Sequence, residues 1–472
     1  MERIGILIIS YGSRETAIID AFARSTNYKT ELYVADKQKN PFNLKHAKEH
    51  VVIPDLNIQA ITKFAKRNKQ HLDFGIVGPE KPIIEGIRDQ IEEQTRIPII
   101  CPTKDYAIEA SKVTQRQLMQ KVAPEANPKF KIFNPRDYKT FTAVKKDVYT
   151  WLDQLDNQAV VKPDKPVAGK GVGVWGDHFT TREELFDHFL ASYQHGTVII
   201  EEKIDGEESS FQAFCDGKRI TPLPETRDYK RAFDDDKGPN TGGMGSYKDS
   251  GSILPFMNQK DRDKEIELVN KLFRELRRKA TNTDLRGLPF YDAFIHTAKG
   301  PRLLENNSRP GDPEIMNILP VLKDDLVDIC YRILEGNLSN IKIDNKATVV
   351  TYKAPPTYSG YAQAFPDRVE EAEIDTPVNL DEARKLSEKH GENIRIYPGS
   401  MELREDGRTY ALSSRAVCAV GVADDIQTAR EISLEGLQVI KGGALWHRND
   451  IASREHIASS VEHMNRLRQQ KS

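Results

Sequence analysis

The stretch "LPFYDAFIHTAKGPRLLENNS" (residues 288–308) places two apolar-rich runs on either side of a short turn signal. We predict a β-hairpin that turns at Lys299–Gly300, because a glycine between two such runs is typical of a hairpin turn. Residues two apart in a strand face the same side, so Glu305 and Asn307 project together. If the hairpin pairs around this turn, Asp292 on the partner strand reaches the same face.

Oxygen ligands on a rigid hairpin suit Mg²⁺, which takes few protein ligands and shares the others with phosphate and water. A polar edge facing solvent would carry the same residues, and the hairpin alone does not decide between the two. The rigid turn "SRPGDPE" (308–314) that follows favours a site. We therefore predict that Mg²⁺, or Mn²⁺ in its place, is held by Glu305, Asn307 and Asp292. A structural role is the alternative for Asp292.

Two upstream segments carry groups suited to a nucleotide. In "VVKPDKPVAGKGVGV" (160–174), Lys162 ends an apolar run and Lys170 lies in a glycine loop. Lysines and glycine amides are what a polyphosphate needs, although the Walker A spacing is absent and a plain turn would look similar. In "VIIEEKIDGEESSF" (198–211) a strand ends in paired acids. Its backbone could read an adenine edge and a carboxylate could bind ribose, or the acids could simply be solvated.

Composition narrows the class of protein. The chain has 472 residues, 38% hydrophobic and 30% charged, so we expect a soluble globular protein of roughly two to four domains. Lys and Arg number 69 against 71 Asp and Glu, which argues against a nucleic-acid partner beyond a nucleotide. Four widely spaced cysteines form no metal or redox motif, and no apolar run is long enough for a membrane span. We expect a cytoplasmic monomer or homodimer with small-molecule substrates and no membrane contact.

The order of elements predicts a multidomain fold of α/β and α+β parts. Short apolar runs alternate with helical stretches over the first hundred residues, as in a parallel sheet covered by helices. The lysine after a strand, the glycine loop, the strand with paired acids and the hairpin follow in that order. After about residue 340 the pattern changes to a smaller α+β unit.

In this order the motifs resemble the ATP-grasp superfamily, whose members hold ATP between two α+β lobes and make acyl phosphates from carboxylates. The match narrows to the phosphoribosylamine–glycine ligase family through "RDYKRAFDDDKGPNTGGMGSY" (227–247), "AGKGV" (168–172), "ENNSRPGDPE" (305–314) and "WHRNDI" (446–451). The resemblance implies an N-terminal α/β substrate-binding domain with a parallel sheet (1–104). It also implies a two-lobed ATP-grasp domain (105–338, mobile lid lobe about 125–205) and a C-terminal α+β domain (339–472).

The resemblance also implies a reaction. Glycine would be joined to 5-phosphoribosylamine through a glycyl phosphate, giving glycinamide ribonucleotide, ADP and phosphate in de novo purine biosynthesis. The residues that would hold ATP are Lys112, Lys162, Gly169, Lys170, Gly171, Glu201, Glu202, Ile204 and Glu208. The residues that would act at the reacting groups are Arg309, Asp228, Lys230 and Arg231.

The residues that would contact the two smaller substrates are Gly12, Ser13, Arg14, Glu15, Gly78, Pro79, Glu80, Asn240, Thr241, Gly242, Gly243, Gly245 and Asp312. The first loop, "SYGSRET" (10–16), has fewer glycines than the family pattern, which restricts how closely its backbone can approach a phosphate. Another ATP-grasp carboxylate–amine ligase with a different amine or amino acid is therefore the alternative. A non-catalytic nucleotide sensor on this fold is a further alternative, but it would have lost the metal ligands or the phosphate lysines.

Overall fold

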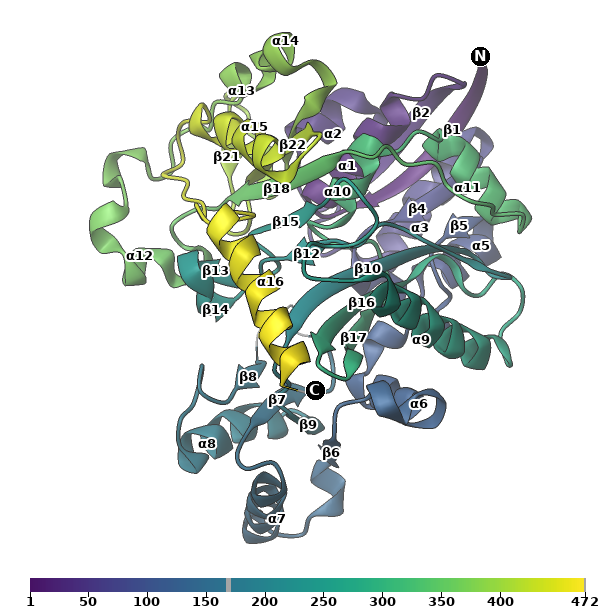
Figure 1. Cartoon of the computed structure of the whole chain (residues 1–472). Coiled ribbons are helices and arrows are strands. Elements are labelled where there is room, and N and C mark those ends of the chain that lie inside the picture. The colour runs from purple at the N-terminus through teal and green to yellow at the C-terminus, as the bar shows by residue number, and fades with distance from the viewer. Residues whose placement is uncertain (167–170, 471–472) are drawn as a thin grey trace.

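The computed structural model describes residues 1–166 and 171–470. Four larger sheets organise this part of the chain (Figure 1). The N-terminal and C-terminal sheets lie side by side in the upper half of the view, and a separate lobe with helices α7 and α8 lies below them. Within the described ranges, no helix combines the length and apolar composition that a membrane crossing requires.

The N-terminal domain is built on a parallel sheet of five strands, as the alternating pattern predicted. Their order is β3 (Ala47–Val52), β2 (Tyr28–Asp36), β1 (Glu2–Ser10), β4 (Phe74–Val77) and β5 (Ile99–Ile100). Helix α1 (Ser13–Ala23) packs on one face, and α3 (Ile58–Asn68) and α5 (Ile87–Thr95) pack on the other. The strand order reverses between β1 and β4, and ligands of such sheets bind beyond the carboxyl ends at that point.

The lower lobe is an antiparallel sheet with its own core. Its strands are ordered β6 (Phe130–Phe133), β9 (Val198–Glu202), β7 (Ala159–Pro163) and β8 (Gly173–Val174). Helices α7 (Phe141–Gln154) and α8 (Arg182–Tyr193) bury apolar side chains against it. Thr181 and Glu184 form the expected capping box at the start of α8. We call this lobe the lid lobe, after the mobile lid expected at about residues 125–205.

The central sheet carries the predicted hairpin. Its strands are ordered β11 (Ile220–Pro222), β10 (Glu207–Asp216), β16 (Arg286–Thr297) and β17 (Gly300–Asn307). Thr297 pairs with Gly300, which confirms the predicted turn. Helices α6 (Lys112–Val122) and α9 (Gln259–Arg277) pack on one face of this sheet in a shared apolar cluster.

The C-terminal sheet crosses the domain boundary expected at residue 339. Its order is β12 (Arg227–Asp228), β15 (Gly245–Lys248), β18 (Ala347–Lys353), β22 (Val417–Ala423) and β19 (Ile394–Pro398). The first two strands come from the glycine-rich segment 227–248, which is thus anchored in the C-terminal domain. Helix α15 (Ile426–Gln438) covers this sheet, and α16 (Arg454–Gln469) extends from it towards the lid lobe (Figure 1).

Shorter elements connect these units. They are α2 (Pro41–His46), α4 (Glu80–Glu85), β13 (Arg231–Phe233), β14 (Lys237–Asn240), α10 (Ile315–Ile318), α11 (Leu326–Glu335), α12 (Tyr361–Ala364), α13 (Asp381–Lys385), α14 (Ser387–His390), β20 (Met401–Leu403) and β21 (Thr409–Ala411).

Candidate active site

One face of the central hairpin gathers the predicted metal ligands, and we call it the site face. Glu305 pairs with Ala293 and Asn307 pairs with Tyr291, so the two polar side chains lie on the same side of the sheet. The pairing of Ile295 with Glu208 extends this side onto β10. The site face therefore unites Glu305, Asn307 and Glu208, which are far apart in sequence.

Glu305 is a half-buried carboxylate held among positive charges. Burial alone would raise its pKa, but Lys230, Lys112, Lys162 and Arg309 together lower the pKa below the usual value. The backbone of Glu305 pairs with Ala293, but its side chain has no hydrogen bond or ion pair within the described ranges. It is thus an ionised carboxylate with free acceptor capacity, surrounded by groups that attract phosphate.

The donor chemistry of this pair fits Mg²⁺. Asn307 donates its amide nitrogen to the Tyr291 carbonyl at 3.5 Å, which leaves the amide oxygen for another partner. The described residues contain no group of three or more His, Cys, Asp or Glu side chains that could cage a metal by themselves. Two protein oxygens, completed by phosphate and water, are the arrangement in which Mg²⁺ is commonly bound.

The expectation that Asp292 joins Glu305 and Asn307 on one face is wrong. Asp292 pairs with Asn306 in the hairpin, and strand residues one position from Glu305 and Asn307 point to the opposite side. The Asn306 amide donates to Asp292 Oδ1 at 2.6 Å, and the Asp292 side chain is fully buried. We call this opposite side of the hairpin the packed face.

The packed face holds a cluster of buried polar groups under α9. Ser209 donates to Glu265 at 2.7 Å and lies 2.8 Å from His296 Nε2. Burial, with a smaller repulsion from Glu265, raises the pKa of Asp292 to about 8. Glu225 also has a raised pKa, because it is buried and lies near Glu265. Asp292 and Glu225 on this side therefore have raised pKa values, whereas Glu305 on the site face has a lowered one.

At the base of the lid lobe, Glu201 is engaged by two cations. Its carboxylate accepts from Arg116 Nη2 at 3.0 Å and from Lys162 Nζ at 2.7 Å. These cations overcome the effect of burial and lower the pKa of Glu201 to about 2. Arg116 also donates to the Leu303 carbonyl of β17 at 2.9 Å. Glu201 therefore fixes Lys162 beside the hairpin.

The other predicted nucleotide residues differ in their surroundings, and Lys112 is the first residue of α6. Glu202 accepts from Arg302 at 2.6 Å, and Glu208 accepts from Lys230 at 2.6 Å. Within the described ranges, the backbone amide and carbonyl of Ile204 make no hydrogen bond, as an adenine-reading position requires. Gly171 has φ +86° and its carbonyl lies 3.0 Å from His188 Nε2. Gly169 and Lys170 lie outside the described residues.

Arg309 links the site face to the N-terminal domain. Its Nε lies 3.7 Å from a Glu80 carboxylate oxygen and 3.6 Å from one of Glu109, and its guanidinium lies over the Tyr291 ring. Burial and the proximity of Glu80 raise the pKa of Glu109 to about 7 despite Arg309. Arg309 Nε is buried without a hydrogen bond among the described atoms, so this cation retains a donor for a ligand.

The segment 227–248 brings three more predicted residues to the same region. Lys230 binds Glu208, and the pKa of Lys230 is raised because nearby carboxylates outweigh its burial. Asp228 Oδ1 is buried without a partner in the described chain, and burial followed by Glu314 raises the pKa of this carboxyl. Arg231 lies 3.4 Å from Asp177 of the lid lobe. These side chains therefore connect the site face, the segment and the lid lobe.

The glycines of this segment are fixed by close packing. Gly243 has φ +100°, and a Cβ there would lie 2.4 Å from Asp228 Oδ1 and 2.7 Å from Pro313. A Cβ on Gly245 would lie 2.5 Å from the Val350 carbonyl. Thr241 donates to the Lys230 carbonyl at 2.9 Å, and Asn240 pairs with Arg231 across β13 and β14. Gly242 alone among these glycines is exposed.

Sequence reasoning missed Arg415, which closes the segment from the C-terminal domain. Arg415 donates to the carbonyls of Gly242 at 2.7 Å and Gly243 at 2.8 Å, and it pairs with Asp312 at 3.1 Å. Burial raises the pKa of Asp312, but Arg415 and other arginines bring the net pKa below its usual value. The sequence signal that could have found it is the single arginine in the otherwise small and apolar run "LSSRAV" (412–417).

The first loop does not present its side chains as expected. Arg14 and Glu15 are 2% and 0% exposed and pair with each other. Glu15 accepts from the backbone amides of Tyr11 and Gly12, so it occupies the start of α1 where a phosphate could otherwise bind. Ser13 donates to the Tyr397 carbonyl at 3.0 Å. These three side chains are thus engaged within the protein, and their predicted contact with the amine substrate stays a prediction.

Gly78 and Pro79, also predicted to contact substrate, lie at the carboxyl end of β4. A Cβ on Gly78 would lie 1.7 Å from Glu15 Oε1, so this glycine is required by packing. Pro79 precedes α4, and Glu80 at the start of α4 is the residue that faces Arg309.

Two family models match the chain one after the other. The phosphoribosylglycinamide synthetase N domain matches residues 4–109, and the ATP-grasp (A) domain of the same family matches residues 110–315. A protein of Methanocella arvoryzae described as phosphoribosylamine–glycine ligase is 36% identical over 472 residues, covering 98% of this chain and 99% of the relative. The counterpart from Pyrococcus furiosus is 34% identical over 474 residues, with 98% of both chains covered.

Solved structures show the same fold. The phosphoribosylamine–glycine ligase of Thermotoga maritima has a TM-score of 0.71 at 22% identity, covering 95% of this chain and all of its own. An L-amino acid ligase from Bacillus licheniformis has a TM-score of 0.59 at 13% identity, with 93% of this chain and 98% of its own covered. At these sequence identities the two structures support the assignment of the fold and nothing more.

Proposed function

The chain belongs to the phosphoribosylglycinamide synthetase family, and we propose that it assembles its reaction around Glu305 and Arg309 on the site face. It is an ATP-dependent ligase that joins glycine to phosphoribosylamine in purine biosynthesis. The observation that supports this placement is the free, ionised Glu305 carboxylate surrounded by Lys112, Lys162, Lys230 and Arg309. Phosphoryl transfer depends on such positioning and charge neutralisation more than on a nucleophilic side chain.

We propose two steps for the ligation. A glycine carboxylate oxygen bonds to the γ-phosphorus of ATP, the bond to the ADP oxygen breaks, and glycyl phosphate forms. The nitrogen of phosphoribosylamine then bonds to the acyl carbon, phosphate leaves, and the nitrogen loses a proton. Arg309 and Lys230 would hold the phosphoryl oxygens, because both remain cationic beside Glu305.

Mg²⁺ held by Glu305 and Asn307 would supply charge neutralisation at the phosphate oxygens. Lys162, fixed by Glu201, and Lys112 at the start of α6 would point positive charge at the polyphosphate. Ile204 would read the adenine edge with its unpaired backbone groups. The glycines of segment 227–248, held by Arg415, would leave room for a carboxylate as small as glycine's.

We propose that the protein is cytoplasmic, on the basis of its cysteine thiols. All four cysteines are buried and free, and burial raises the pKa of Cys101 and Cys330. Buried, protonated thiols without disulfides are typical of proteins in a reducing cytoplasm.

The test is an assay of ADP release with defined substrate pairs. We expect the purified chain to release ADP with glycine and phosphoribosylamine together, and to form one ligated product for each ADP. Glycine alone, the amine alone, and other amino acids with phosphoribosylamine serve as controls. ADP release that is equally fast with another amino acid or another amine would contradict the assignment of this substrate pair.

A further inference from the structure

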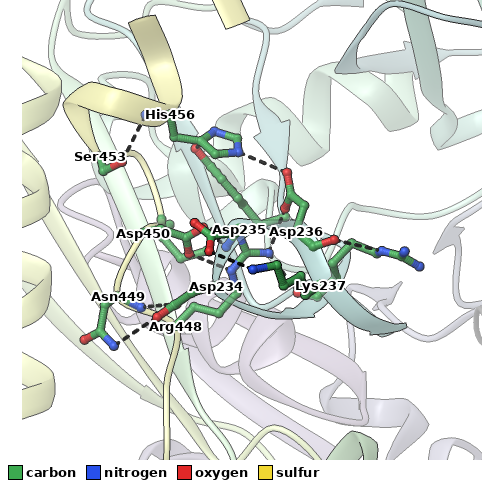
Figure 2. A network of polar contacts seen from close by, with 12 residues as sticks. Asp234, Asp235, Asp236, Lys237, Arg448, Asn449, Asp450, Ser453 and His456 are labelled. Atoms are coloured by element: carbon green, nitrogen blue, oxygen red, sulfur yellow. Dashed lines mark hydrogen bonds and ion pairs between the residues drawn. The ribbon is translucent and has the colours of Figure 1, made fainter. Parts of the chain in front are cut away.

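The motif "WHRNDI" (446–451) has no place in the reaction described so far, yet it forms a dense polar network with segment 227–248. Arg448 lies at its centre and is 1% exposed (Figure 2). Its Nε and Nη2 donate to the two carboxylate oxygens of Asp450 at 2.7 and 2.6 Å, and Nη1 lies 2.9 Å from Asp236. A buried arginine whose guanidinium donates hydrogen bonds along two of its edges is held in one orientation.

The network grips a strained part of the segment. Asp235 and Asp236 have φ values of +59° and +51°, a conformation that costs free energy for residues other than glycine. The Asp235 amide donates to Asp450 at 2.9 Å, and the Asn449 amide donates to Asp234 at 2.8 Å. These contacts offset the strain, and they come entirely from the C-terminal domain.

Helix α16 reinforces the same turn. Ser453 caps its start by accepting from the His456 amide, and His456 Nε2 lies 3.0 Å from Asp236 (Figure 2). The other ring nitrogen of His456 lies 3.3 Å from the Tyr229 hydroxyl, and Arg448 lies over the Tyr229 ring. The turn 234–236 is therefore held from two directions.

Arg448 also connects this turn to the lid lobe through Arg231. Nη1 of Arg448 donates to the Arg231 carbonyl at 2.9 Å, and Arg231 Nε donates to the Asp236 carbonyl at 3.2 Å. The remaining nitrogens of Arg231 reach the lid lobe, where Nη2 lies 3.4 Å from Asp177 and Nη1 lies 3.4 Å from His178 Nε2. Arg448 thus holds the backbone of Arg231, and the Asp236 carbonyl holds its Nε, on the side opposite the lid lobe contacts.

We propose that Arg448 is a positioning residue for lid closure: it fixes Arg231 so that Arg231 holds the turn 175–179 of the lid lobe over the reacting groups. The inference rests on the proposed glycyl phosphate step, because a closed lid lobe protects an acyl phosphate from water. When this contact is lost, glycyl phosphate is hydrolysed. Water then bonds to the acyl carbon and loses a proton, phosphate leaves, and glycine is regenerated, so that ATP is consumed and ADP is released without a ligated product.

The chain offers a matched control in Arg430. This arginine of α15 holds the same C-terminal segment, since Nε donates to the Ile451 carbonyl at 3.0 Å and Nη2 donates to the Asn449 carbonyl. Among the described residues, the hydrogen bonds of Arg430 reach this C-terminal segment and none reaches residues 227–248. Replacing Arg430 therefore loosens the motif without removing its connection to Arg231.

The experiment compares full-length Arg448→Met, Arg430→Met and Asp177→Asn with the unmodified chain, and measures ADP released per product ligated. We expect the ratio to stay near one in the unmodified chain and in Arg430→Met. In Arg448→Met and Asp177→Asn the ratio of ADP to product should rise severalfold. The KM for ATP should also rise about tenfold in both variants. A purely structural brace would lower both rates together and leave the ratio at one.

A double variant tests whether Arg448 and Asp177 act through the same contact. If Arg448 acts through the Arg231–Asp177 contact, the effects of Arg448→Met and Asp177→Asn on the ratio should not add. Asp177 is 42% exposed, so its replacement tests the lid contact even if Arg448→Met does not fold. A ratio of one in Asp177→Asn overturns the inference, as does an equal response of Arg448→Met and Arg430→Met. An unmodified chain that fails to ligate contradicts the proposed function instead.

Discussion

The two faces of one hairpin carry carboxyl groups, Glu305 and Asp292, that lie one residue position apart in the ladder. Their pKa values are shifted in opposite directions. On the site face, Glu305 has a lowered pKa because Lys230, Lys112 and Lys162 outweigh its burial. On the packed face, Asp292 has a pKa of about 8 because it is buried with no cation to balance it. The same chemical group is thus an ionised ligand on one face and a neutral core residue on the other.

The difference shows that residue type and proximity in sequence do not define a metal site. Alternation along the strand sends Asp292 and Glu305 to opposite sides, and only one side receives the cations from α6, the lid lobe and segment 227–248. A carboxylate can bind a metal ion or substrate when other elements place cations beside it and leave its oxygens free for a ligand. Changes on the two faces should therefore affect different properties of the protein.

The largest effect should follow from removing the charge on the site face. Glu305→Gln keeps the size of the side chain but removes the ionised oxygen, and we expect ligation to fall by roughly 10³-fold because charge stabilisation at the reacting phosphate is lost. Thermal unfolding should stay close to that of the unmodified chain, since Glu305 makes no ion pair within the described ranges. A variant that retains more than a tenth of the activity, as measured by product formation, would mean that Glu305 is not a ligand.

The next largest effect should come from Arg309→Met, which keeps the side-chain length and removes the cation. We expect kcat to fall by about 10²-fold, because a donor aimed at the transferring phosphoryl group is lost. The positive charge of Arg309 lowers the pKa of both Glu80 and Glu109, so removing the guanidinium should raise both pKa values. Arg302→Met on the same hairpin is the control, since Arg302 pairs only with Glu202 among its described contacts. Equal losses in both variants would count against a catalytic role for Arg309.

On the packed face, Asp292→Asn should leave ligation within about twofold and change the pH dependence of stability instead. The folded pKa of about 8 lies above the unfolded value of roughly 3.9, so the folded state keeps a proton that the unfolded state loses. The stabilising contribution is complete below about pH 4 and is lost as the pH rises towards 8.

Urea unfolding between pH 5 and 8 measures this contribution. The unmodified chain should lose up to about 1.4 kcal/mol per pH unit more than Asp292→Asn over that window. Glu225 has a raised pKa too, so part of the slope should remain in the variant. Parallel stability curves for the two proteins would show that Asp292 is already ionised in the folded state.

The smallest effect should come from Ser209→Ala. This change removes the hydroxyl that joins Glu265 and His296, and a hydrogen bond to a buried charged or polar group contributes about 1–2 kcal/mol. We expect the free energy of unfolding to fall by that amount at pH 7, while KM and kcat stay unchanged. A drop in kcat would show that the two faces are coupled through the sheet.

Much of the fold could be predicted from the sequence, because its signals are local. The parallel sheet of the N-terminal domain, the turn at Lys299–Gly300 and the capping box at the start of α8 depend on residues that are neighbours along the chain. The Glu305 and Asn307 pair on one face was predicted for the same reason, since two positions in a strand share a side. The family motifs added the reaction.

Only the tertiary structure decided which of these groups are free to act. It placed Asp292 in the core, filled the start of α1 with Glu15, and engaged Glu201 with Arg116 and Lys162. It also brought Arg415 and Arg448 from the C-terminal domain onto segment 227–248, across more than 170 residues of chain in each case. Protonation and availability depend on what distant elements place beside a side chain, and that proximity exists only in the folded protein.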